Sequence, residues 1–454
     1  MMVEITEEKK AYLASFKNSE ANWSRNGGSW ALDMRKDAMS RFEELGFPTT
    51  RHEEWKYTNV TPVKKVPFKL SDRTPPKDGA RVDRAALSRF DLGGFQCATA
   101  VFIDGHFSSE LSSLDGFPEN VTIQSTNTAL ESGEAVLREN LGKHASYNDH
   151  SFVALNTALM QDGLFINVPA GTVVETPVRL LFVSTGPEEP RMAHPRNLFV
   201  VGENAQICVV EDYCQLGEGE RLYFNNIVTE FSIDRNAVVD HYKLERESLN
   251  AFHIASLVIH QKDQSHFCSH NVSLGGSLVR NDILAVLDGE HIESTLNGLI
   301  IASGTQLLDN HTRIVHAKPN CNSWEVYKGI LDDKSHGVFN GKIYVAQDAQ
   351  KTDAKQTNQS LLLSDTASMN AKPELEIYAD DVRCTHGATI GQLDADALFY
   401  LRSRGLDTET AKHLLVYAFA SDVLTSIRQE ALRAEIQKML FSKLPQEQGL
   451  EGLV

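Results

Sequence analysis

The chain has 454 residues, too many for one ordinary compact core, so two or three domains or one long repeat body are expected. Its formal net charge of -17 is balanced by no run of Lys or Arg, which argues against nucleic acid or an anionic membrane as the main partner. The first residues, MMVEITEEKKAYLASF, contain no apolar signal-peptide core, and no apolar run reaches the roughly 18 residues of a membrane span, so we expect a cytoplasmic protein.

Residues 1–150 are predicted to form a mostly helical domain. Apolar residues recur at spacings of three and four in TEEKKAYLASFKN and in SWALDMRKDAMSRFEELGFP, which ends at the helix-stopping Gly46 and Pro48. The later segments AALSRFDLGG and ALESGEAVLRENLGKHA continue this helical pattern. Between them, TAVFIDGHF predicts a short hairpin with its turn at Asp104 and Gly105.

Residues 151–393 are predicted to be the β core. From Thr172 onward short runs rich in Val, Ile and Tyr follow one another, and polar turns separate them at intervals of 26 to 33 residues. The turns are GENA, DRNA, KDQS, DGEH, KPNC, AQDA and ADDV. Short strands in a loose repeat, with no helix between them, favour a parallel β-helix, whose coils pair with one another. An antiparallel sandwich or a large barrel is the alternative.

Residues 394–454 return to helical spacing, with a break at Gly405 and an N-cap at Asp407 or Thr408. A helical domain of this size buries little by itself. It must therefore pack on the β body or offer an apolar face to a partner, and Phe399, Leu415 and Phe419 are apolar residues on more than one face.

Several catalytic motifs are missing from the sequence. It contains no GxxxxGK[ST] phosphate loop, no GxGxxG after a first strand and no GxSxG elbow. The six cysteines form no CxxC pair, which argues against a disulfide framework or a closed structural zinc site. They are Cys97, Cys208, Cys214, Cys268, Cys321 and Cys384, most of them expected to be small buried residues.

The remaining candidates are His and Cys residues that alternate along strands. Cys384 and His386 are two residues apart, so they would face the same side of a strand and could bind one iron or zinc ion. His266, Cys268 and His270 have the same spacing, although such a triplet is more often a row of partly buried polar residues. Two ligands do not close a tetrahedral site, so a second subunit would have to supply the others.

Two long stretches resemble the SufB/SufD family of iron–sulfur cluster assembly proteins, and the SufD subunit in particular. GFPTTRHEEWKYTNV (Gly46–Val60) is similar to the N-terminal signature of the family. The segment from Lys351 to Leu406, which contains KPELEIYADDVRCTHGATIGQLD, is similar to its C-terminal signature. The resemblance implies a mainly β fold with helical ends: an N-terminal helical domain, a right-handed parallel β-helix core and a C-terminal helical domain.

The resemblance also implies a non-enzymatic subunit that works inside a complex. Such a subunit pairs with a SufB-type scaffold through the end of the β-helix and carries a SufC-type ATPase on residues 394–454. It holds an iron–sulfur cluster only transiently, at the interface between subunits. On its own it could form a homodimer, and neither the cluster type nor a role for flavin is fixed by the sequence.

The resemblance extends to individual residues at only a few positions. His386 corresponds to the histidine that is a proposed cluster ligand at the SufB interface, and Cys384 lies beside it as a second ligand or as a packing residue. The scaffold subunit has a Cys where we align Ala367, and a Glu-His-Glu-Ala stretch where this chain has Cys-Thr-His-Gly. These differences favour SufD over a SufB-like scaffold that holds its own cluster. A carbohydrate-active β-helix enzyme is the third hypothesis.

Overall fold

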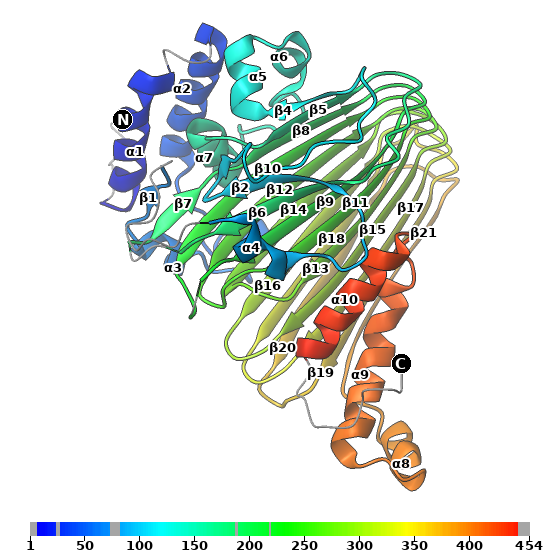
Figure 1. Cartoon of the computed structure of the whole chain (residues 1–454). Coiled ribbons are helices and arrows are strands. Elements are labelled where there is room, and N and C mark those ends of the chain that lie inside the picture. Colours follow the sequence, from blue (N-terminus) through cyan, green and yellow to red (C-terminus); the bar gives the residue numbers. More distant parts are fainter. Residues whose placement is uncertain (1–6, 24–27, 73–81, 187–188, 218, 444–454) are drawn as a thin grey trace.

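The computed structural model describes residues 7–23, 28–72, 82–186, 189–217 and 219–443, and its body is a solenoid of two facing β-sheets (Figure 1). Sheet A has 11 strands: β4 (Thr122–Ser125), β5 (Leu164–Val168), β8 (Arg196–Val201), β10 (Tyr223–Ile233), β12 (Phe252–Gln261), β14 (Leu278–Leu287), β16 (Leu307–His316), β18 (His336–Val345) and β20 (Ser368–Ile377), with β1 (Lys69–Leu70) and β7 (Arg191–Ala193) to one side. Sheet B has 10 strands: β2 (Ala98–Ile103), β3 (His106–Phe107), β6 (Val178–Ser184), β9 (Gln206–Gln215), β11 (Val238–Arg246), β13 (His266–Ser273), β15 (Glu293–Ala302), β17 (Asn322–Leu331), β19 (Asp353–Leu362) and β21 (Arg383–Gly391).

From β9 to β21 the chain alternates between the two sheets, and each strand pairs in parallel with the strand of the next coil. Residues at equivalent positions therefore form rows along the axis, and because side chains alternate, each row faces either the interior or the outside. Stacked interior rings follow this spacing: the ring centroids of Phe182 and Tyr213 are 4.8 Å apart, and those of Phe199 and Phe231 are 4.6 Å apart. The solenoid and its helical ends confirm the predicted fold class and exclude the sandwich and barrel.

The polar turns predicted from the sequence stack into a ladder at one corner of the solenoid. Asn204, Asn236 and Gln264 have left-handed backbone conformations, with φ of 59°, 54° and 58°. The backbone N–H of Asn204 donates to the carbonyl of Arg235 in the next turn, and that of Asn236 donates to Asp263. Asparagine tolerates this conformation better than most residues, which explains why the repeat is visible as polar turns rather than as identical sequences.

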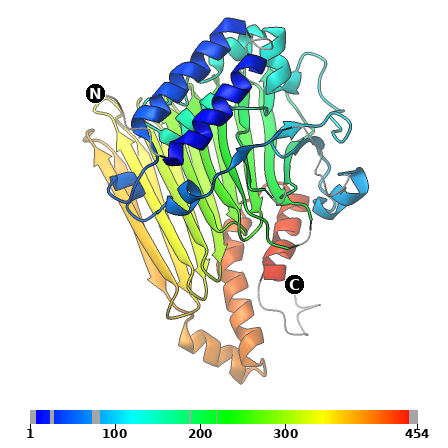
Figure 2. The same cartoon turned by 90° about the vertical axis from the view of Figure 1, so that its left-hand side faces the viewer.

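Most of the N-terminal helices cover the outer face of sheet A at the start of the solenoid (Figure 2), whereas the short helix Arg84–Leu87 and the 3-10 turn after it pack on the outer face of sheet B, against Leu181 and Val183. The N-terminal helices are α1 (Glu7–Trp23), α2 (Gly28–Leu45), α3 (Thr61–Lys65), α4 (Arg84–Leu87), α5 (Thr126–Ser132), α6 (Ala135–Asn140) and α7 (Ser151–Leu159), with short 3-10 turns at Glu53–Trp55 and Ser88–Phe90. The predicted hairpin is present as β2 and β3, with positive φ at Asp104 and Gly105. Its first strand pairs with β6, so the N-terminal region already contributes to the sheets.

The stretch from Gly46 to Val60 fastens the N-terminal region to sheet A. The guanidinium of Arg280 lies 3.7 Å from the ring centroid of Trp55 and donates to the carbonyl of Glu54 at 2.7 Å. The hydroxyl of Thr58 donates to the carboxylate of Asp309. Arg280 and Asp309 also form a buried ion pair with each other at 2.9 Å. The stretch is therefore held by two sheet A residues whose charges neutralise one another.

The C-terminal region consists of α8 (Ala395–Ser403), α9 (Thr408–Leu424) and α10 (Glu430–Lys443). Helices α9 and α10 pack their apolar residues against an apolar row on the outer face of sheet B, which includes Leu244, Val272 and Leu299. Helix α8 projects away from the sheets and has no buried residue (Figure 1). In the part of the chain that the structure describes, no helix has the length and apolar character needed to cross a membrane.

Candidate functional site

The last coil of the solenoid ends in two strands, β20 and β21, that are the terminal strands of their sheets (Figure 2). Each pairs on one side only, with β18 and β19 respectively, in the described part of the chain. Six consecutive residues of β21, from Thr385 to Ile390, are exposed, in contrast to the buried strands below. This end of the molecule presents free backbone hydrogen-bonding groups and the Cys-Thr-His-Gly sequence to its surroundings.

Cys384 and His386 occupy adjacent interior rows of this last coil. The register places Cys384 over Ala354 and His386 over Gln356, and both of these lower residues are buried. The two candidates therefore share a strand face, as predicted from their spacing. They differ in exposure, because the Cys384 thiol packs partly into an apolar cluster with Ile343 and Ala354, whereas His386 is exposed.

The thiol of Cys384 is not set up as a reactive thiolate. Partial burial, together with the nearby carboxylate of Asp353, raises its pKa above the usual value. A cysteine that binds iron does so as the thiolate, so metal binding at Cys384 would have to overcome this preference. His386 has no such obstacle, since neutral imidazole is itself a metal ligand.

The described residues contain no group of three or more His, Cys, Asp or Glu side chains arranged to hold a metal ion. His386 and Cys384 thus offer at most two ligands at an exposed edge. What the arrangement can do chemically is to contribute an imidazole, and with it a thiol, to a site that other groups complete.

The triplet His266, Cys268 and His270 is engaged in packing within the folded chain. Nδ1 of His266 lies 3.1 Å from the carboxylate of Glu293. Nε2 of His270 lies 2.8 Å from the hydroxyl of Ser426, beyond the end of α9, and burial lowers the pKa of His270 to about 4. Burial raises the pKa of Cys268 to about 12. The imidazole of His270 therefore fastens the C-terminal helices to sheet B.

Ala367, the position aligned with a scaffold cysteine, lies just before β20 and is buried in a small apolar cluster with Leu331 and Leu308. An alanine side chain offers no ligand there.

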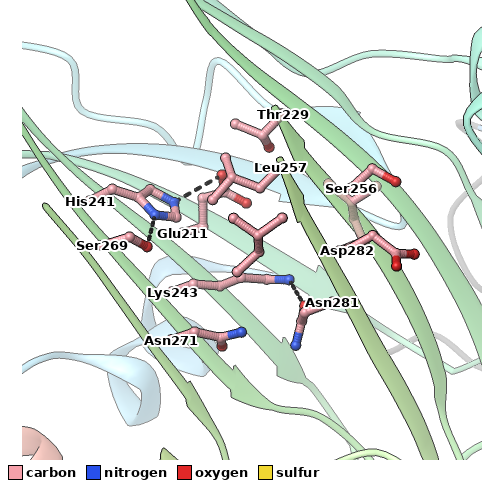
Figure 3. A pocket seen from close by; sticks show the side chains of 13 residues that line it. Glu211, Thr229, His241, Lys243, Ser256, Leu257, Ser269, Asn271, Asn281 and Asp282 are labelled. Atoms are coloured by element: carbon pink, nitrogen blue, oxygen red, sulfur yellow. Dashed lines mark hydrogen bonds and ion pairs between the residues drawn. The ribbon is translucent and has the colours of Figure 1, made fainter. Parts of the chain in front are cut away.

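A second group of polar residues lies inside the solenoid and was not found from the sequence (Figure 3). Nε2 of His241 lies 3.3 Å from the carboxylate of Glu211, and its Nδ1 lies 2.9 Å from the hydroxyl of Ser269. Nζ of Lys243 donates to Asn281 at 2.6 Å and pairs with Glu245 at 2.7 Å. All of these side chains are buried.

The neighbours of Glu211 in this group keep its carboxylate ionised. Burial by itself would raise the pKa of Glu211, but the His241 imidazole and the Lys243 ammonium offset burial and lower it to about 2. The remaining cavity of about 10 Å³ has room for one water molecule. The sequence signal is polar and charged residues within otherwise apolar strands, Glu211 and Asp212 in VVEDY and His241 and Lys243 in DHYKL. On the sequence alone, either parity could face outward.

A larger groove, of about 640 Å³, separates the N-terminal region from the outer face of sheet A. Some of its charged residues pair across it, as in the 3.3 Å contact between His150 and Asp282 and the 3.6 Å contact between His311 and Glu54. The groove is therefore part of the joint between the two regions.

Comparison with known proteins places the whole chain in one family. Residues 6–180 match the model of the SufBD protein N-terminal region, and residues 182–419 match the SufBD core domain of SUF system FeS cluster assembly. The chain is 37% identical to an iron–sulfur cluster assembly SufBD family protein of Synechocystis, over 90% of each chain. It is 32% identical to the iron–sulfur cluster assembly protein SufD of Escherichia coli, over 96% of this chain and 99% of that one. Against the protein SufB of Bacillus subtilis the identity is 23%, over 86% of this chain and 84% of that one. The chain therefore belongs to the SufBD family of iron–sulfur cluster assembly proteins.

Proposed function

We propose that this chain is a SufD-type, non-enzymatic subunit that pairs with a SufB-type scaffold and supplies His386 as a ligand to a cluster assembled between them. One observation carries the proposal: the imidazole of His386 is exposed on the terminal strand of an otherwise closed solenoid. The 32% identity to the SufD protein of Escherichia coli, over 96% of this chain, supports the assignment within the family.

The open end suits a partner of the same architecture. Edge strands accept another strand through backbone hydrogen bonds, and side chains between them add specificity. Apolar side chains are also exposed on the last coil, with Tyr378 61% exposed and Ile390 45% exposed. Burial of these side chains would contribute to pairing, while His386 would lie within the interface.

Imidazole suits a site that must later release its cargo. An iron–sulfur cluster binds to thiolate or imidazole ligands, and imidazole binds iron less firmly than thiolate does. A shared site with one imidazole from this chain would hold the cluster as a transient product. Cys384, whose thiol is protonated and half-buried, would act mainly as a packing residue beside it.

We also propose that α8 docks a SufC-type ATPase. Phe399 and Tyr400 are 72% and 56% exposed, and the helix has no buried residue of its own. Helices α9 and α10 already use their apolar residues to cover sheet B. They therefore hold α8 in place, and α8 is the helix that would contact the ATPase. Removal of residues 395–454 would uncover that surface, so a change confined to α8 tests the docking better than a deletion.

The test of the ligand role is His386→Ala, expressed together with the scaffold and the ATPase. Removal of an exposed imidazole should leave folding and subunit pairing intact, whereas loss of one ligand from a shared site should abolish most cluster formation. The measurement is the iron and sulfide content, with the cluster absorbance, of the purified complex.

Two substitutions serve as controls for this test. His266→Ala removes a partly exposed imidazole of the same sheet that is paired with Glu293, and it should leave the cluster content unchanged. Cys384→Ala should reduce the content less than His386→Ala does. Normal iron and sulfide in the His386→Ala complex would show that the imidazole is not a ligand.

A further inference from the structure

The row of side chains beneath His386 contains two buried polar residues with no role in the fold described so far. The register places His386 over Gln356 of β19, and Gln356 over Glu325 of β17. Neighbouring strands lie about 4.8 Å apart, so the three residues form a column running from the open end into the interior. Leu296 of β15 is the next residue in the row and is fully buried. The column therefore ends there in apolar packing.

Among the residues that the structure describes, the polar atoms of this column have no hydrogen-bond partner of normal geometry. Gln356 and Glu325 are each 1% exposed, and neither the two amide atoms of Gln356 nor the two carboxyl oxygens of Glu325 have a hydrogen-bond partner. The buried hydroxyl of Thr312, on β16 of the opposite sheet, approaches Glu325 closely enough to lower the pKa of its carboxyl, although the two groups do not complete a hydrogen bond of normal geometry. Buried polar groups are normally satisfied, so several orphans in one place indicate bound water or a functional demand.

The opposite sheet leaves room for this column. Gly341 of β18 follows Thr312 in its row, and a Cβ atom at Gly341 would lie 1.5 Å from Nε2 of Gln356. The amide of Gln356 therefore occupies the space that a side chain at position 341 would take. Ile283, buried beneath Thr312, belongs to the same apolar core cluster as Leu296 and helps to close the column from below.

No cation balances the carboxyl group in the column. Burial raises the pKa of Glu325 to about 7, and the hydroxyl of Thr312 only partly offsets it. The titratable neighbour Tyr327 stays neutral, because burial and the adjacent carboxyl raise its pKa well above the usual value. Glu325 is thus an acid that can change its protonation state near neutral pH, at the base of a column that ends in an imidazole.

We infer that Gln356 and Glu325 are positioning residues for His386, and that through ordered water they set which ring nitrogen of its imidazole carries the proton. The inference rests on the proposed ligand role of His386. A histidine ligand binds metal through an unprotonated nitrogen, and the hydrogen bond at its other nitrogen fixes which one that is.

The amide of Gln356 can transmit the state of Glu325, because it carries a donor at one side and an acceptor at the other. An ionised Glu325 accepts from the amide NH2 and leaves the amide oxygen directed toward His386. A water molecule that donates to this oxygen can accept from the inward N–H of the ring, so the outward nitrogen is free to bind metal. A protonated Glu325 donates to the amide oxygen instead, and the amide NH2 then favours the other tautomer.

The test is the tautomer of His386 in the full-length chain, read from nitrogen-15 chemical shifts of its ring and assigned with His386→Ala. In the native chain at about pH 8 we expect one tautomer to dominate, because Glu325 is then mostly ionised. In Gln356→Leu we expect the mixture seen for free histidine. In Glu325→Gln, which keeps the shape but cannot ionise, the tautomer ratio should no longer change between about pH 6 and 8.

Ser294→Ala is the matched control, because it removes a buried, unpartnered hydroxyl from the neighbouring row of the same sheet. This variant should keep the native tautomer. In the complex with the scaffold, Gln356→Leu should also lower the iron and sulfide content, by about 10- to 100-fold if it acts as other residues that orient metal ligands do.

A native-like tautomer in Gln356→Leu, or the free-histidine mixture in the native chain, would overturn the inference. The readout also separates it from the proposed function. A tautomer that depends on Gln356, combined with normal clusters in His386→Ala, would leave the column intact and refute only the ligand role.

Discussion

Buried charged side chains in this protein are of two kinds, paired and unpaired. Arg196 and Glu230 are fully buried and paired at 2.6 Å, and the same carboxylate accepts the backbone N–H groups of Gly142 and Ala145. That ion pair thereby joins the N-terminal region to sheet A. Glu325 has no comparable partner, so its titration should affect stability.

We predict that Glu325→Gln stabilises the protein at alkaline pH. The pKa of Glu325 is raised from 4.5 to about 7 in the folded chain, so between these values the folded state holds a proton that the unfolded state has lost. Stability therefore falls as pH rises through this window, by at most about 3 kcal/mol, and the deficit is complete above the folded pKa. The glutamine amide in the variant does not ionise, so the variant does not lose this stability as the pH rises.

The measurement is the melting temperature of the native chain and of Glu325→Gln at about pH 5 and about pH 8. At the higher pH the variant should melt at a higher temperature than the native chain. At the lower pH most of this difference in melting temperature should disappear. An equal difference at both pH values would mean that Glu325 does not titrate in this window.

The sequence identified His386 and Cys384 but not the residues beneath them. Their spacing alone places these two on one strand face, and the family resemblance points to the histidine. Glu325 lies far from His386 along the chain, and only the coil-to-coil register brings the two into one row. Alternation within a strand predicts which residues share a face, but it does not predict how many residues each turn contains.

At the scale of single elements, the three C-terminal helices have different roles. Val416, Ala420 and Leu424 of α9 are buried against sheet B, and Ile436 and Leu440 of α10 continue this contact. The ammonium of Lys328 on β17 secures α9 through the carboxylate of Asp422 at 2.7 Å. Helix α8 makes no such contact, and its aromatic side chains remain in solvent.

We predict that the double substitution Phe399→Ala and Tyr400→Ala weakens binding of the ATPase at least about 30-fold, as expected when aromatic residues at the centre of an interface are removed. The melting temperature of the isolated chain should not change, because neither ring is buried. Titration with the purified ATPase measures the affinity. Trp324→Ala, which removes a 37% exposed ring from β17, should bind normally; unaltered binding by the double variant would exclude α8 as the docking site.

The elements themselves were largely predictable, since β-rich runs between polar turns became strands and the helical spacings became helices. The turns were recognisable because a left-handed backbone favours residues such as Asn204 and Asn236. The docking of α9 and α10 was not predictable. It depends on an apolar row on the outer face of sheet B. A strand that is apolar on both faces shows no alternation of polar and apolar residues, so the sequence does not reveal which of its apolar residues face outward.

At the scale of the whole molecule, the two ends of the solenoid differ. The first coils are closed by the antiparallel pairs β2–β3 and β4–β5 and by the helices above them. The last coil ends in β20 and β21 with one edge of each exposed (Figure 2). An uncovered parallel edge favours association, since nothing else covers it in the described chain.

We predict that the isolated chain self-associates through this end at high concentration, and that Ile390→Lys suppresses the association. Ile390 is 45% exposed on β21, so a lysine there can reach solvent in the monomer but would be buried in a pair. Sedimentation velocity over a range of concentrations measures the effect. Val173→Lys changes a similarly exposed residue near the start of the solenoid and should leave association unaltered; equal dimerisation of all three proteins would place the contact elsewhere.

The unbroken coil-to-coil register also bears on how such a chain can change length during evolution. Insertion of one residue within a strand would turn every later side chain of that strand to the opposite face, exchanging core for surface. Duplication of a full coil, from one Asn turn to the next, would preserve every row and lengthen the body by about 4.8 Å. Whole-coil changes could therefore alter the distance between the helix-covered start and the open end while the terminal strand keeps its sequence.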